Sequence, residues 1–89
     1  LAMAQQDMVL APLVQRAAIL CRDDEFQSFV SSEFPLDWTT TTGTDDEKAA
    51  AIMREQCMVS SRKELATNRD AAERFDLLTG KFEMWKRQN

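Results

Sequence analysis

Apolar residues recur at helical spacing in four stretches of the chain. The first stretch begins at Pro12, a residue favoured at the first position of a helix because its missing N–H costs nothing there. Ile19 falls off the apolar face of this stretch, so we expect it to be exposed or covered by a second contact. The residues that share this face at ~100° per residue are Leu13, Val14, Ala17, Leu20 and Cys21, and Val9 and Leu10 would extend it upstream.

The second and third stretches open with residues that cap helices. The acidic run 23–25 places carboxylates at a helix N-terminus, where they accept hydrogen bonds from free N–H groups. Pro35 ends that helix at or before Phe34, because a residue before proline avoids the α region. Thr44 and Glu47 have the spacing of a capping box, and the helix they open should end near Met58. The apolar faces consist of Phe26, Phe29 and Val30 in the second stretch and of Ala49, Ile52, Met53 and Cys57 in the third.

Residues 35–44 join these two stretches and form the one long connection that we expect. Leu36 and Trp38 should be held against the body of the protein. The Thr-rich segment 39–44 should be a mobile loop, since a single β-strand there would have no partner strand.

The last stretch carries the clearest helical pattern. Ser61 and Glu64 form a second capping box, which opens a short helix, and Thr67 or Asn68 then caps the longest helix. We expect that helix to run without a break from about residue 69 to at least residue 85, with Gly80 facing water. Its apolar stripe has the a/d spacing of two heptads, and its members are Ala71, Phe75, Leu78, Phe82 and Trp85, with Leu77 and Met84 widening it on one side.

These patterns predict an all-α fold, a compact orthogonal bundle of four to five short helices. The 89 residues fit one domain. We expect the helical domain to cover residues 12–89, and residues 1–11 to be a flexible N-terminal segment or vector-derived. No apolar run reaches the ~18 residues of a membrane span, so no membrane contact is expected.

The composition excludes several kinds of chemistry. The chain has no His, which removes the usual catalytic base and the usual zinc ligand, and it has no Gly-rich phosphate loop. Its two cysteines, Cys21 and Cys57, stand in no CxxC pair. We expect them to be buried thiols in a reducing cytoplasm, with a bridge between the two helices as the alternative. The sequence therefore predicts a non-enzymatic protein with no catalytic residues, no metal ligands and no cofactor.

A helix-turn-helix DNA-binding protein is the alternative function, since residues 47–85 contain a helix, a short turn and a helix. The net charge of −4 argues against it, because affinity for nucleic acid depends on neutralising phosphates. The basic residues of its candidate recognition element also alternate with acidic ones and form no basic stripe. They are Arg62, Lys63, Arg69 and Arg74, interleaved with Glu64, Asp70, Glu73 and Asp76.

Binding to another protein is the function that remains, and a second copy of the chain is one such partner. Protein interfaces favour aromatic residues and arginine. Both Trp residues have a second interpretation, burial in the small core. The residues expected to contact a partner are Ile19, Trp38, Arg62, Lys63 and Trp85.

Three segments together resemble a group of small proteins encoded by phages and prophages of proteobacteria. They are PLVQRAAILC at residues 12–21, CMVSSRKEL at residues 57–65, and AERF at residues 72–75 followed by Phe82 and Trp85. The resemblance covers roughly residues 12–87. It implies the cytoplasm of a bacterial host and an accessory role in phage DNA replication or recombination, and it assigns no catalytic residues.

Overall fold

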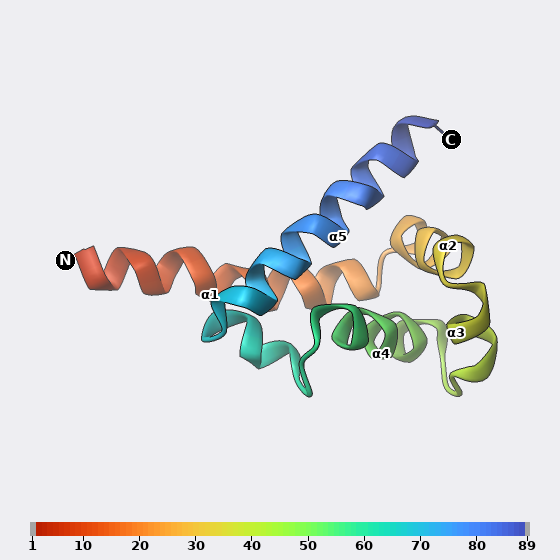
Figure 1. The fold of residues 1–89 in the computed structure, drawn as a ribbon, viewed down its shortest axis with the longest axis horizontal. Helices are drawn as coiled ribbons and strands as arrows, with labels where there is room; N and C mark the ends of the chain where they lie inside the picture. Colours follow the sequence, from red (N-terminus) through yellow and green to blue (C-terminus); the bar gives the residue numbers. More distant parts are fainter. Residues whose placement is uncertain (1, 89) are drawn as a thin grey trace.

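The computed structural model describes the backbone of residues 2–88 and the side chains of residues 12–88. Its elements in chain order are α1 (Ala2–Cys21), α2 (Asp24–Glu33), α3 (Pro35–Thr40), α4 (Asp45–Cys57), the 3-10 helix η1 (Arg62–Ala66) and α5 (Arg69–Gln88). No strand occurs in this part of the chain, so the predicted all-α fold class is confirmed. In Figure 1, α5 crosses α1, while α4 and η1 lie on the opposite side of α1 from the free end of α5.

Side-chain caps define the starts of most helices, as the sequence predicts. The Asp23 carboxylate accepts a hydrogen bond from the Glu25 N–H at 2.8 Å. Capping boxes open both α4 and η1, and the Asn68 side chain caps α5 by accepting from the Ala71 N–H at 3.1 Å. The left-handed residue Met58, with φ of 60°, follows the end of α4. Local hydrogen bonding therefore sets these boundaries, which is why the sequence locates them.

The predicted start of the first helix at Pro12 is wrong, because α1 begins at Ala2 and Pro12 lies inside it. The preceding segment is rich in Ala, Gln, Met and Leu, which favour helix strongly. A helix continues through a single proline at the cost of one backbone hydrogen bond. The proposed flexible or vector-derived character of residues 1–11 stays a prediction.

The long connection predicted at residues 35–44 is also wrong in part, because α3 occupies its first six residues. Pro35 starts α3. The hydroxyls of Thr39 and Thr40 then donate to backbone carbonyls four residues earlier, at 2.8 and 2.9 Å. Leu36 is 80% exposed rather than held against the body, whereas Trp38 is half-buried on the core as expected. The loop shrinks to residues 41–44, and its mobility stays a prediction.

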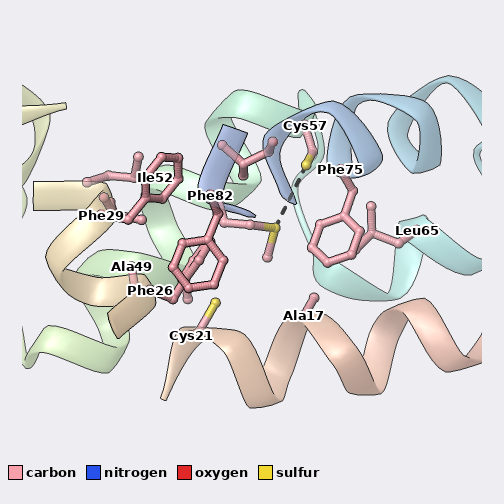
Figure 2. Close-up of a cluster of buried hydrophobic side chains, with 14 of the residues drawn as sticks. Ala17, Cys21, Phe26, Phe29, Ala49, Ile52, Cys57, Leu65, Phe75 and Phe82 are labelled. Carbon is pink, nitrogen blue, oxygen red and sulfur yellow. Dashed lines mark hydrogen bonds between the residues drawn. The ribbon is translucent and has the colours of Figure 1, made fainter. Parts of the chain in front are cut away.

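Aromatic residues from α2 and α5 form the centre of the core. The Phe82 ring lies 5.2 Å from Phe26 and 5.3 Å from Phe29 between centroids, and Trp85 lies 5.9 Å from Phe29. Figure 2 shows Phe26, Phe29 and Phe82 of this group beside Ile52. At the other end of the core, Phe75 and Leu65 face Ala17 of α1 (Figure 2). Cys21 and Cys57 are both buried and both free, as predicted.

Helix α5 runs without a break through Gly80, which confirms the prediction for the last helix. Ala71, Phe75, Leu78 and Phe82 are buried, and Trp85 is partly buried against them. An added Cβ at Gly80 would have no atom within 4 Å, so this residue does face water. Leu77 and Met84 do not widen the stripe, because they are 69% and 59% exposed. At ~100° per residue both point away from Phe75, which explains their exposure.

Candidate functional site

A groove of about 490 Å³ opens between the end of α1, one face of α4 and the start of η1. We call it the arginine groove, because three guanidinium groups border it together with two carboxylates. Its lining residues are Ala18, Cys21, Arg22, Asp46, Glu47, Ala50, Arg54 and Arg62.

Three separate elements bring the arginines to this groove. Arg22 directly follows the last residue of α1. Arg54 lies on α4 one turn after Ala50, so these two share the face that lines the groove. Arg62 is the first residue of η1, which packs along α1. The capping box of η1 therefore fixes the point at which Arg62 enters the groove.

Both carboxylates of the groove already accept hydrogen bonds from groups other than the arginines. Glu47 Oε1 accepts from the N–H and the hydroxyl of Thr44, at 3.1 and 3.0 Å, and these bonds lower the pKa of Glu47. Asp46 Oδ1 accepts from Gln27 Nε2 at 2.8 Å, and the same Gln27 nitrogen donates to the Cys21 carbonyl. Within the part of the chain whose side chains are described, no ion pair involves an arginine of the groove.

The Cys21 thiol lies at the inner wall of the groove, where it is only 1% exposed. Burial raises its pKa, and the hydrogen bond and positive charge of Arg62 oppose that rise, as does the charge of Arg54. Burial also raises the pKa of Cys57, to about 11. Both thiols are therefore protonated at neutral pH, which leaves them weakly nucleophilic.

Of the five residues predicted to contact a partner, only Arg62 lines the arginine groove. Ile19 is 61% exposed and precedes Arg22 by one turn of α1, so it lies near the groove without lining it. Lys63 follows Arg62 and is exposed, outside the lining.

The two Trp residues are partly buried against the core, and neither lines the arginine groove. The Lys48 ammonium lies 5.2 Å from the centre of the Trp38 ring, and Trp85 stacks on Phe82 at 6.4 Å between centroids. Trp38 also borders a second, acidic hollow of about 380 Å³, with Asp24, Gln27, Ser28, Ser31 and Asp45. Both side chains therefore have structural contacts, which is the second interpretation that the sequence left open.

The sequence does not indicate Arg22 and Arg54 as site residues. A cation directly after a helix, as at Arg22, has a local explanation in the helix dipole, and Arg54 belongs to no motif. Only the packing of α1 against α4 brings the two together, so no local pattern could have identified them.

The four basic residues of the candidate helix-turn-helix recognition element lie in different places in the structure. Arg74 Nη1 donates to the Cys57 carbonyl at 3.2 Å, which holds this side chain against the body of the protein. Arg62 borders the arginine groove, while Lys63 and Arg69 are exposed. The basic side chains of the candidate recognition element therefore lie in three different surroundings.

Two further features are absent from the described residues. No helix there is long and apolar enough to cross a membrane. No group of three His, Cys, Asp or Glu side chains there is arranged to hold a metal ion. In comparisons with known proteins, no family model, no curated protein and no solved structure matches this chain.

Proposed function

We propose that the protein is a non-enzymatic binding protein whose arginine groove receives an acidic side chain of a partner protein. The observation that carries this proposal is the set of three guanidinium groups around one groove whose own carboxylates are bonded elsewhere. A guanidinium group matches a carboxylate through two parallel hydrogen bonds. Arginine is also among the residues that contribute most to protein interfaces.

The surroundings of the groove suit a protein partner. Arg54 and Arg62 are half-buried, so their charges are partly shielded from water and interact more strongly with an incoming carboxylate. The exposed Ile19 lies one turn from Arg22 and offers an apolar contact beside the charged groups. A partner segment with an acidic residue next to an apolar one would satisfy both.

The resemblance to small phage and prophage proteins supports a biological setting for this binding. We propose that the protein is a phage or prophage accessory protein in the bacterial cytoplasm, with a role in DNA replication or recombination through its protein partner. The binding of an acidic side chain in the arginine groove does not depend on a phage setting, so the two parts of the proposal are tested separately.

Affinity capture from bacterial cells that carry such a phage or prophage tests the groove. The wild-type protein should retain a partner that Arg54→Gln and Arg62→Gln lose. Arg69→Gln is the matched control, since it removes the same charge from an exposed position outside the groove. Equal retention of every captured protein by the wild type and all three variants would contradict the proposal.

The helix-turn-helix alternative predicts that the protein binds DNA with an affinity that depends strongly on the salt concentration. A DNA-binding protein loses affinity steeply as salt rises, because each neutralised phosphate releases counterions. We expect only weak, sequence-independent retention of duplex DNA by this acidic protein. Tight binding whose affinity falls steeply between about 50 and 200 mM salt would favour the alternative.

A further inference from the structure

The side of α5 that faces away from the core carries two large apolar residues. Leu77 and Met84 are 69% and 59% exposed. They stand seven positions apart, which places them on one line about 10.5 Å apart along the helix. This spacing is that of one seam of a helix pair. We call the surface formed by Glu73, Leu77, Gly80, Met84 and Arg87 the outer face of α5.

Gly80 lies between the two apolar residues on the outer face. An added Cβ there would have no atom within 4 Å, so the helix backbone is open to solvent at this point. A second helix can approach an α-helix more closely at a glycine than at any other residue. The outer face thus combines a shallow centre with an apolar side chain on either side.

Charges on the exposed sides of α5 are distributed unevenly between its two halves. The first half carries Asp70, Glu73 and Asp76, with Arg69 at its start and Arg74 turned to the Cys57 carbonyl. The second half carries Lys81, Lys86 and Arg87, and its acidic residue, Glu83, pairs with Lys86 at 3.4 Å. An antiparallel copy of the same helix would place acidic groups opposite basic ones in both halves.

We propose that two copies of this chain pair through the outer faces of α5, antiparallel, about a two-fold axis near residues 80 and 81. This register sets Leu77 beside Met84 of the second copy and Glu73 beside Arg87 of the second copy. A symmetric pair uses each contact twice, because the same surface serves both subunits. None of the residues that line the arginine groove belongs to α5, so the groove stays open in the dimer.

The size of the contact determines how stable the dimer is. The apolar part of the proposed contact consists of only Leu77 and Met84 from each copy, whereas stable interfaces bury at least roughly 1,200 Å² in total. We therefore expect a dimer that forms reversibly as the protein concentration rises. The charge pattern favours a second copy over an unrelated helix, because the acidic first half of α5 complements the basic second half of an antiparallel copy.

Sedimentation equilibrium of the full chain over a concentration series tests the pairing. The average mass should rise from 10.2 kDa towards twice that value at low salt. Leu77→Glu should remain at the monomer mass. Ile19→Glu is the matched control, because Ile19 is 61% exposed on α1, and this variant should dimerise like the wild type. Circular dichroism of each variant checks that the helices are retained.

A charge exchange tests the register without touching the apolar residues. Glu73→Arg and Arg87→Glu should each weaken dimerisation about tenfold, since each change replaces two attractive contacts by two repulsive ones. The double variant should restore it. A wild type that stays monomeric up to about 1 mM, a Leu77→Glu variant that dimerises like the wild type, or a double variant as weak as the single ones would overturn the proposal.

Discussion

Phe82 of α5 packs against Phe26 and Phe29 of α2 at the centre of the aromatic cluster. Its replacement by alanine tests how much this packing contributes to the stability of the core. The ring is 2% exposed and lies within 5.3 Å of both Phe26 and Phe29 between centroids. Trp85 stacks on it from the next turn of α5. Emptying such a site costs the transfer energy of the ring and leaves a cavity among its neighbours.

We expect Phe82→Ala to lower the free energy of unfolding by about 3–5 kcal/mol, the range for burial of an aromatic ring. The loss should fall in the upper part of that range, because three aromatic contacts of about 0.5–1.5 kcal/mol each disappear with the ring. A small domain has about 5–15 kcal/mol in total, so the variant should be only marginally folded. Phe82→Leu should cost less, since it keeps most of the buried volume.

Urea denaturation followed by far-UV circular dichroism and by Trp fluorescence measures this loss. Circular dichroism reports the helices, and Trp85 reports the cluster itself because it stacks on Phe82. Both signals should change together in the wild type, as expected for a two-state domain. A loss below about 1 kcal/mol in Phe82→Ala would refute the view that this cluster holds α5 to α2.

Three further predictions follow from local features. Gly80→Ala should raise the free energy of unfolding by up to about 1 kcal/mol, because Ala loses less entropy than Gly in an open helix position; a lower melting temperature would contradict this. Thiol titration should find almost no reaction of Cys21 and Cys57 in the folded protein and two reactive thiols after denaturation; zero after denaturation would reveal a disulfide. Hydrogen bonds from Thr44 lower the folded-state pKa of Glu47 below its ordinary 4.5, so the stability they provide is present above that pH and is lost as the pH falls through the lowered pKa. Glu47→Gln should therefore show a smaller loss of melting temperature between pH 7 and pH 3 than the wild type, and an equal loss would contradict the assignment.

The helix boundaries that the sequence predicts well are those set by local hydrogen bonds. Capping boxes at Thr44 and Ser61 need only residues three positions apart, so their spacing is visible in the sequence. The continuity of α5 across Gly80 follows in the same way, because the apolar stripe keeps its phase on both sides of the glycine.

The errors concern features in which local signals compete. Proline at position 12 favours a helix start, yet α1 begins at Ala2 because the residues before the proline favour helix strongly. The Thr-rich segment has low helix propensity, but Pro35 favours a helix start, and the short helix α3 includes Thr39 and Thr40. The orientation of Leu77 and Met84 could have been obtained from the helical period, since both lie opposite Phe75.

Most of the candidate site could not be predicted from the sequence, because it forms only when α1, α4 and η1 pack together. The sequence predicts Arg62 as a partner-binding residue, but it does not predict Arg22 and Arg54, which line the same groove. The engagement of Asp46 by Gln27 joins two helices far apart in the chain, and no pattern in the sequence indicates it.

Nuclear magnetic resonance of the arginine Nε–H groups tests the central proposal most directly. The protein is titrated with hexaglutamate and, in a separate series, with a short DNA duplex at the same ionic strength. We predict that hexaglutamate shifts the signals of Arg22, Arg54 and Arg62 together, leaves that of Arg69 in place, and that the duplex shifts none of the three. Unchanged signals of the groove arginines with hexaglutamate, or larger shifts with the duplex, would contradict the account.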